Sequence, residues 1–205
     1  MILCLVTDRR RRPVIDQCRD ASRAGVDLIQ VREPDLDAAA LAALVVQLVE
    51  LTRTTKTRVV VNDRIDVALA CGAGGVHLRG DSIPPDRVRS MAPAGFLIGQ
   101  SVRGVDDALH AAPYVDYLIA GTVFPTRSKP GLREHLAVDG LSAIVRAVRG
   151  PVLAIGGVSM DRIEAVAGAG AAGIAGIGLF DAEGETLVSA IREVRRRFDS
   201  TRSAS

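Results

Sequence analysis

Eight short runs rich in isoleucine, valine and leucine recur along the 205-residue chain, and each is followed by a longer segment with apolar residues at helical spacing. Several of these runs are continuously apolar, as is typical of parallel strands buried on both faces. The predicted strands are Ile2–Thr7, Asp27–Val31, Arg58–Asn62, Gly75–Leu78, Phe96–Gln100, Tyr117–Ala120, Val152–Ile155 and Gly173–Ile177. The alternation predicts a parallel sheet with a helix after every strand.

The intervening segments are the predicted helices: Pro13–Ala24, Asp37–Arg53, Arg64–Cys71, Pro84–Met91, Val105–Ala112, Val138–Val148, Met160–Ala167 and Glu185–Phe198. A closed barrel and an open doubly wound sheet both satisfy this order. The turn after the first strand, Thr7–Pro13, lacks the glycine-rich phosphate loop of a dinucleotide-binding fold. Eight even units favour an α/β protein with a single (β/α)8 barrel over residues 1–198. The polar residues 199–205 are predicted to form a disordered tail.

Composition excludes several classes of partner. The 26 basic and 24 acidic residues nearly balance, and aromatic residues make up only 3% of the chain, so we predict no nucleic-acid partner. No apolar run approaches the roughly 18–20 residues of a membrane helix, so we predict no membrane association. The basic cluster Arg9 to Arg12 follows the first apolar run, opposite to the order in an export signal, and is expected to be a solvated loop. Three cysteines within apolar patterns favour a cytoplasmic protein.

Polar side chains gather where the predicted strands end. In barrel enzymes the active site lies at the carboxyl ends of the strands, so these positions are the candidates for chemistry. They are Gln30, Arg32 and Glu33 after the second strand, Asn62 and Asp63 after the third, His77 and Asp81 around the end of the fourth, Ser101 and Arg103 after the fifth, and Thr126, Ser128 and Lys129 in the long connection after the sixth.

Glycines follow the last two strands, as Gly156–Gly157 and Gly176–Ile177–Gly178. Without Cβ atoms, the backbone N–H groups of such loops can approach an anion closely. The two loops therefore predict a phosphate site, with plain tight turns as the alternative.

Several of the other candidates also have a structural interpretation. Arg32 and Glu33 could pair as a salt bridge on the rim of the barrel. Asn62–Asp63 could hold Mg²⁺ beside a diphosphate, or cap a helix. His77 is either a catalytic acid or base or a hydrogen-bonded core residue, and Lys129 either an anion contact or a solvated lysine.

Seven motifs lie at or near these strand ends. They are QVRE at 30–33, VVNDRIDVAL at 60–69, GVHL at 75–78, IGQSV at 98–102, DYLIAGTVFPTRSKPG at 116–131, AIGG at 154–157 and GAGAAGIAGIG at 168–178. Through them nearly the whole chain resembles the thiamine-phosphate synthase/TenI family. The resemblance implies a barrel. It also implies one of two reactions: the synthase joins hydroxymethylpyrimidine diphosphate to thiazole phosphate with Mg²⁺ and releases diphosphate, whereas a TenI-type enzyme shifts a proton on a thiazole phosphate.

The resemblance also assigns roles to residues. It implies that the pyrimidine diphosphate would contact Gln30, Arg32, Asn62, Ser101 and Lys129. Mg²⁺ would be held by Asp63. The thiazole phosphate would contact Thr126, Ser128, Gly157, Ile177 and Gly178, next to Gly156.

The chain departs from the pattern of each branch. Pro34 replaces a lysine that follows QVRE-type motifs in the synthases, and Ser82 stands where they have a second metal-binding aspartate. Asp81, one residue earlier, is the candidate substitute for that ligand. Conversely, the catalytic histidine of TenI-type tautomerases would fall at Arg103.

The leading prediction is a TenI-like thiazole tautomerase that needs no cofactor. Glu33 and His77 would then be the remaining candidates for proton transfer, with Arg103 at the position of the family's catalytic residue. The alternative is a thiamine-phosphate synthase with Mg²⁺ at Asp63 and Asp81. A non-catalytic regulator that binds thiazole phosphate and an unrelated phosphate-binding isomerase are further alternatives. The oligomeric state is left open, with a homodimer as one option.

Overall fold

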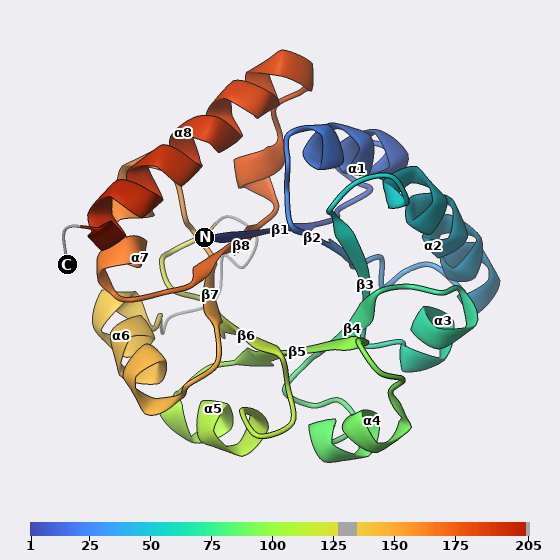
Figure 1. Cartoon of the computed structure of the whole chain (residues 1–205), viewed down its shortest axis with the longest axis horizontal. Helices are drawn as coiled ribbons and strands as arrows, with labels where there is room; N and C mark the ends of the chain where they lie inside the picture. The colour runs from blue at the N-terminus through green and yellow to red at the C-terminus, as the bar shows by residue number, and fades with distance from the viewer. Residues whose placement is uncertain (127–134, 204–205) are drawn as a thin grey trace.

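A computed structural model describes residues 1–126 and 135–203, and its strands form a closed parallel barrel in chain order (Figure 1). The eight strands of the described residues are β1 Ile2–Val6, β2 Leu28–Val31, β3 Arg58–Asn62, β4 Gly75–Leu78, β5 Leu97–Val102, β6 Tyr117–Gly121, β7 Val152–Ile155 and β8 Gly173–Gly176. The pairing of β8 with β1 closes the ring. The predicted (β/α)8 barrel is confirmed.

The helices surround the strands as an outer ring in Figure 1. They are α1 Val14–Arg23, α2 Ala38–Thr52, α3 Ile65–Ala70, α4 Pro85–Met91, α5 Val105–Ala111, α6 Ala137–Ala147, α7 Ile163–Gly168 and α8 Gly184–Ser203, with short 3₁₀ turns η1 Met160–Arg162 and η2 Gly178–Phe180. Each packs an apolar stripe against the sheet. In α2, for example, Leu41, Val45 and Leu48 are buried at successive helical turns.

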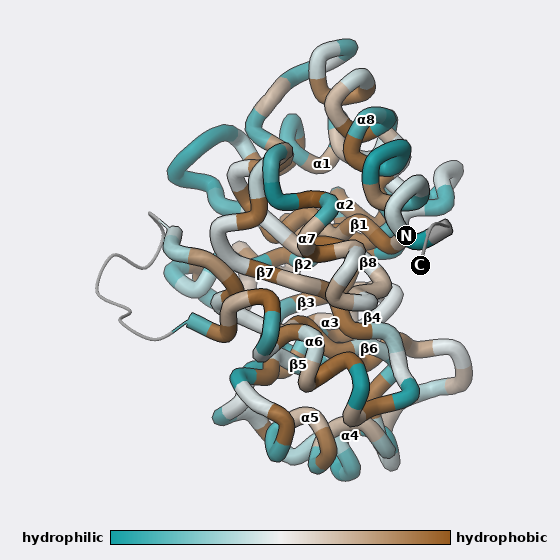
Figure 2. The backbone as a smooth tube through the Cα atoms, turned by 90° about the vertical axis from the view of Figure 1, so that its left-hand side faces the viewer, coloured by the Kyte–Doolittle hydropathy of each residue, from teal (hydrophilic) through white to brown (hydrophobic). Residues whose placement is uncertain are grey.

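The barrel has two apolar layers because alternate strand residues point to opposite faces. The larger layer lies between strands and helices. The smaller fills the barrel interior and includes Cys4, Leu28, Tyr117, Ile119 and Leu153. Figure 2 shows the backbone coloured by hydropathy, with brown segments among the strands at the centre and many teal segments in the loops. None of the helices described is both long and apolar enough to cross a membrane.

The chain end differs from the sequence prediction. Residues 199–203 continue α8 to Ser203, whereas the sequence predicts a disordered tail over 199–205. The hydroxyls of Ser200 and Thr201 donate to backbone carbonyls one turn earlier, and Asp199 pairs with the amino terminus of Met1 at 3.4 Å. The prediction of a disordered tail rested on polarity alone and was wrong over 199–203, because the polar side chains of Ser200 and Thr201 hydrogen-bond to the helix that they extend.

Candidate functional site

The carboxyl ends of β2 and β3 bring two predicted binding residues together. Gln30 is 4% exposed and donates from Nε2 to Oδ1 of Asn62 at 2.9 Å. Because Asn62 accepts this bond through Oδ1, its amide nitrogen is left as a hydrogen-bond donor. The pair forms one side of the barrel mouth, which is the opening at the carboxyl ends of the strands.

Glu33 is buried beside this pair and is bonded to the loop after β1. Its Oε1 accepts from Thr7 Oγ1 at 2.5 Å and its Oε2 from the backbone N–H of Arg9 at 3.2 Å. Thr7 Oγ1 in turn accepts from the backbone N–H of Arg32 at 3.0 Å, while the Arg32 side chain is exposed. No salt bridge joins Arg32 to Glu33, so the alternative of a rim ion pair is not observed.

Asp63 and Ser82 meet at the ends of β3 and β4. The Ser82 hydroxyl donates to Asp63 Oδ1, and Asp63 adopts a left-handed backbone conformation at φ 63° that aims its side chain across to the β4 loop. Arg79 lies 3.6 Å from Asp63 Oδ2. Asp81, the candidate substitute ligand, is instead paired with Arg79 at 2.6 Å and exposed. The carboxylate–hydroxyl pair at Asp63 and Ser82 is therefore the oxygen cluster of this part of the mouth.

The loop after β5 reaches the same region. Arg103 is exposed, and its backbone N–H donates to Asp107 Oδ2 at 3.0 Å in the first turn of α5. The pKa of Asp81 is lowered, mainly by its hydrogen bond from Arg79 and in part by the charge of Arg103. Arg79 of the β4 loop thus lies next to Asp63, and the charge of Arg103 in the β5 loop reaches Asp81.

His77 lies in the barrel interior rather than in the mouth. It is 1% exposed, its Nδ1 lies 3.2 Å from Tyr117 Oη, and its Nε2 lies 2.9 Å from Ser101 Oγ. Desolvation by this burial lowers the pKa of His77 from its ordinary value to about 3. The ring is therefore neutral at physiological pH, and Ser101 connects it to the partly exposed end of β5.

The glycine loop after β7 is shaped by the loop after β6. Gly156 and Gly157 have φ of 95° and 65°, and the Gly156 carbonyl accepts from the N–H of Phe124 at 3.0 Å. A Cβ on Gly157 would strike the Pro125 carbonyl oxygen and approach Phe124 to 2.8 Å. Only glycine fits both the conformation and the space. Arg162 donates to the Gly157 carbonyl at 2.7 Å, which leaves the loop firmly held.

The loop after β8 carries Ile177 and Gly178, and sequence reasoning missed the cation beside it. Arg11 Nη1 would lie 3.6 Å from a Cβ on Gly178, and Arg11 forms an ion pair with Asp181. The sequence predicts a solvated loop at Arg9 to Arg12. The sequence did offer one signal: Arg11 follows the first strand, and the first and last strands of a closed barrel, β1 and β8, are neighbours.

Two of the predicted thiazole-phosphate and diphosphate contacts, Ser128 and Lys129, lie outside the described residues. Thr126, just before them, is described and partly buried. These three therefore remain predictions.

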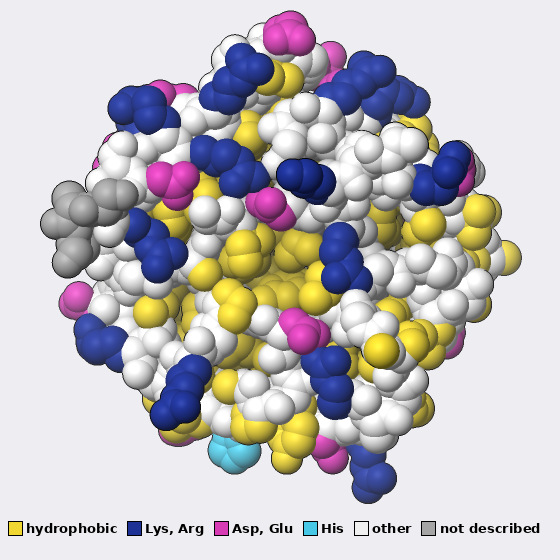
Figure 3. Space-filling view, viewed as in Figure 1, with side chains coloured by type: hydrophobic (Ala, Val, Ile, Leu, Met, Phe, Trp, Pro, Cys, Tyr) yellow, Lys and Arg dark blue, Asp and Glu magenta, His cyan; other side chains and the backbone are white. Residues whose placement is uncertain are grey.

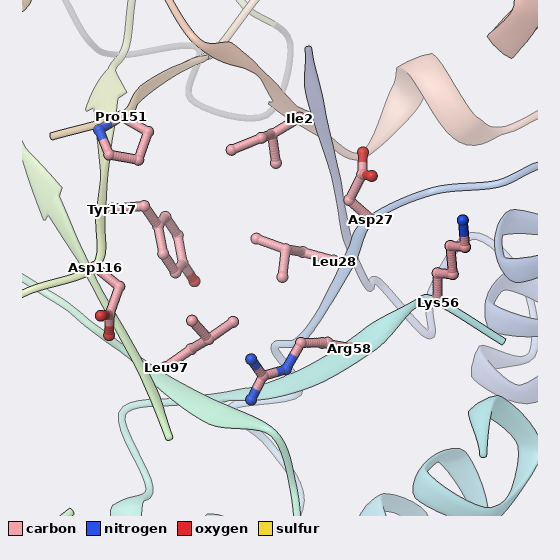
Figure 4. Close-up of a pocket in the computed structure, with 9 residues that line it drawn as sticks. All are labelled: Ile2, Asp27, Leu28, Lys56, Arg58, Leu97, Asp116, Tyr117 and Pro151. Atoms are coloured by element: carbon pink, nitrogen blue, oxygen red, sulfur yellow. The ribbon is translucent and has the colours of Figure 1, made fainter. Parts of the chain in front are cut away.

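Cavities occur at both ends of the barrel. At the amino ends of the strands a cavity of about 250 Å³ is lined by Ile2, Leu28, Leu97 and Tyr117, with charged side chains at its edge (Figure 4). Figure 3 shows the hollow centre of this face, with hydrophobic side chains inside and charged ones around it. At the carboxyl ends a second cavity of about 180 Å³ is lined by residues that include Gly80, Gln100 and Ser101.

The two carboxylates that line the cavity at the amino ends, Asp27 and Asp116, are engaged in structural bonds. Asp27 accepts from Arg195 and from the backbone N–H of Leu3, both at 2.8 Å. Asp116 accepts from Arg89 and from the N–H of Ile98, both at 2.7 Å. These contacts tie helices to strand starts, so the carboxyl-end mouth is the candidate active site.

A family model described as thiamine monophosphate synthase matches residues 3–180, which is most of the chain. The chain belongs to the thiamine monophosphate synthase family. Thiamine-phosphate synthase from Roseiflexus castenholzii is 41% identical over 178 residues, covering 85% of this chain and 78% of that protein. Thiamine-phosphate synthase from Methanoculleus marisnigri is 37% identical over 205 residues, covering 98% and 97%. The solved thiamine phosphate pyrophosphorylase from Pyrococcus furiosus superposes with a TM-score of 0.86 at 35% identity, covering 98% and 96%.

These relatives bear on the alternatives that the sequence left open. A barrel enzyme of thiamine biosynthesis, which the two main readings share, is confirmed. The thiamine monophosphate synthase relatives support the synthase alternative better than the TenI-like tautomerase that led the sequence analysis. They likewise give no support to a non-catalytic regulator.

The buried His77 predicts a pH dependence of stability in this family member. Its pKa is about 3 when folded against an ordinary 6.5, so between these values the unfolded chain binds a proton that the folded chain does not. The free energy of unfolding should therefore rise with pH across this window, by about 1.4 kcal/mol per unit from this one group. Urea unfolding at pH 4.5 and 6.5 should show wild type losing about 2 kcal/mol more on acidification than His77→Gln, because the unfolded histidine is already half protonated at pH 6.5. Equal losses in the two proteins would rule the assignment out.

Proposed function

We propose that the chain is a thiamine-phosphate synthase, which joins hydroxymethylpyrimidine diphosphate to thiazole phosphate and releases diphosphate. The observation that carries this proposal is the two-sided mouth. The Asp63–Ser82 oxygen pair and the Gln30–Asn62 amide pair lie on the β2–β4 side, and the glycine loops lie at β7 and β8. Two separate phosphorylated ligands suit such a mouth, whereas a tautomerase acts on one.

The reaction requires stabilisation of the departing diphosphate. Negative charge grows on its oxygens as the bond to the pyrimidine carbon breaks, so positive charge and hydrogen-bond donors held at that place lower the barrier. Arg32 is exposed at this mouth, and we assign to it, with Asn62, Ser101 and Lys129, contacts to the pyrimidine diphosphate. Pro34 supplies no cation where the synthase pattern has lysine, which places more of this role on Arg32.

The donor set at Asp63 fits Mg²⁺. The ion prefers oxygen ligands and is usually held by one or two carboxylates together with substrate phosphates and water. Asp63 offers a carboxylate and Ser82 a hydroxyl in contact with it, while Arg79 bonds Asp81 at 2.6 Å and lies further away, at 3.6 Å, from Asp63. We assign Asp63 and Ser82 to the ion. When bound, Mg²⁺ would supply positive charge to the leaving diphosphate.

The opposite side of the mouth suits the thiazole phosphate. Gly156 and Gly157 form a turn with positive φ that is packed against the loop after β6, and the β8 loop adds Ile177 and Gly178. Arg11 brings a guanidinium beside Gly178. Holding both reactants in one mouth replaces an encounter in solution by an oriented pair.

An assay of the purified protein with both substrates and Mg²⁺ tests the proposal. We expect thiamine phosphate and diphosphate in equal amounts, with product formation lost when either substrate is omitted. If no product forms, and the protein instead catalyses proton exchange on a thiazole phosphate, the tautomerase reading holds and the proposal is wrong.

The Ser82→Asp variant should bind Mg²⁺ more tightly. A second carboxylate next to Asp63 restores the charge that the synthase pattern has at this position, so the Mg²⁺ concentration for half-maximal rate should fall about tenfold. A magnesium titration of the initial rate measures this, with the uncharged Ser82→Asn as the matched control. An unchanged magnesium requirement in Ser82→Asp would contradict the assignment of the ion to this pair.

A further inference from the structure

Three neighbouring strands place Tyr117 and His77 in contact inside the barrel. In the sheet register His77 of β4 lies opposite Gly99 of β5, and Gly99 lies opposite Tyr117 of β6. Because Gly99 has no side chain, the two rings meet across it, with centroids 5.6 Å apart. A Cβ on Gly99 would strike the Tyr117 ring and hydroxyl. The contact therefore depends on glycine at this one position.

The contact continues to Ser101. Ser101 is two residues beyond Gly99 on β5, so it lies on the same face one layer closer to the mouth. His77 bridges the layers through Nδ1 to Tyr117 Oη at 3.2 Å and Nε2 to Ser101 Oγ at 2.9 Å. Within the described residues these are the hydrogen bonds of the Tyr117 and Ser101 hydroxyls.

The burial of Tyr117 determines which atom donates in each of the two hydrogen bonds that link Tyr117, His77 and Ser101. Its hydroxyl hydrogen has one acceptor among the described residues, His77 Nδ1, and a buried donor left without an acceptor is unfavourable. Tyr117 therefore donates to Nδ1. A neutral imidazole then carries its proton on Nε2 and donates to Ser101 Oγ. The hydrogen of the Ser101 hydroxyl is left free to donate into the mouth.

We propose that Tyr117 and His77 are positioning residues that fix Ser101 as a hydrogen-bond donor to the diphosphate of the pyrimidine substrate. The inference rests on the proposed function for the identity of that diphosphate. Neither residue touches the substrate. Their effect is to keep Ser101 from turning its hydrogen inward, so that the serine meets an anion with a donor already oriented.

Nitrogen NMR of histidine-labelled protein tests the proton positions directly. Three histidines are present, and loss of one set of signals in His77→Gln assigns the ring. At pH 7 we expect a neutral His77 with its proton on Nε2. In Tyr117→Phe, which keeps the ring against Gly99 and removes the donor, we expect a mixture of the two tautomers. A wild-type ring protonated on Nδ1 would overturn the inference.

Binding of inorganic pyrophosphate in the presence of Mg²⁺ tests the role of the contact without requiring turnover. Calorimetry should show affinity about tenfold weaker in Tyr117→Phe than in wild type. Tyr114→Phe, at an exposed tyrosine, is the matched control and should match wild type. In a Ser101→Ala background Tyr117→Phe should have no further effect, because the residue through which it acts is gone.

Two outcomes separate this inference from the proposed function. If Tyr117→Phe weakens pyrophosphate binding by the same factor with or without Ser101, the positioning role is wrong even in an active synthase. If the wild type binds pyrophosphate with the expected coupling to Ser101 but forms no thiamine phosphate, the synthase proposal fails and the positioning role stands.

Discussion

Asp63→Asn is expected to lower kcat for thiamine phosphate formation about a thousandfold, because it removes the carboxylate that contacts Ser82 at the mouth. Asparagine is chosen because it tolerates the left-handed conformation that Asp63 adopts at φ 63°, so the backbone should be undisturbed. Steady-state rates at saturating Mg²⁺ and both substrates measure the loss. The free energy of unfolding should change little.

Two further aspartates calibrate this result. Asp86→Asn, in the exposed first turn of α4, is the matched control and should leave kcat within about twofold of wild type. Asp81→Asn tests the alternative ligand suggested by the sequence, and we expect a small loss because Arg79 already holds that carboxylate. A larger loss at Asp81 than at Asp63 would move the metal assignment to Asp81.

Gly157→Ala is expected to weaken thiazole phosphate binding about a hundredfold. The new Cβ would strike the Pro125 carbonyl oxygen and crowd Phe124, and alanine is strained at φ 65°, so the loop must shift away from the phosphate. Loss of one or two backbone bonds to an anion corresponds to about this change in affinity. Calorimetry with thiazole phosphate gives the dissociation constant.

Gly150→Ala provides the control for that experiment. Gly150 has no heavy atom within 4 Å of an added Cβ and lies before β7, at the opposite end of the barrel. Its affinity for thiazole phosphate should equal that of wild type. Wild-type affinity in a folded Gly157→Ala protein would show that the phosphate binds elsewhere.

The sequence predicted the architecture well because each βα unit carries its own signal. The predicted strands Arg58–Asn62, Gly75–Leu78 and Val152–Ile155 coincide with β3, β4 and β7. The fifth strand runs two residues further than predicted, to Val102, because pairing with β6 continues past the apolar run. Hydrophobic periodicity marks where a strand is buried, and polar residues that still pair are missed.

The partners of the site residues were beyond the reach of the sequence. Strand ends identified Glu33 and His77 as candidates, but not that Thr7 and Arg9 bind Glu33 or that Gly99 admits Tyr117 to His77. Each partnership joins segments that meet only when neighbouring strands pair in register. Residue type and strand position can be read locally, whereas hydrogen-bond partners depend on register across neighbouring strands.

The cavity at the amino ends of the strands has a consequence for how this protein can diversify. Substitutions at Asp27 and Asp116 there should adjust thermal tolerance with little cost to turnover, because each carboxylate bonds a helix arginine and the N–H at the start of a strand. Tyr117 is the exception, since its ring lines that cavity while its hydroxyl reaches His77. Of the residues that line this cavity, Tyr117 is therefore the one whose substitution we expect to alter ligand binding at the opposite end of the barrel as well as stability.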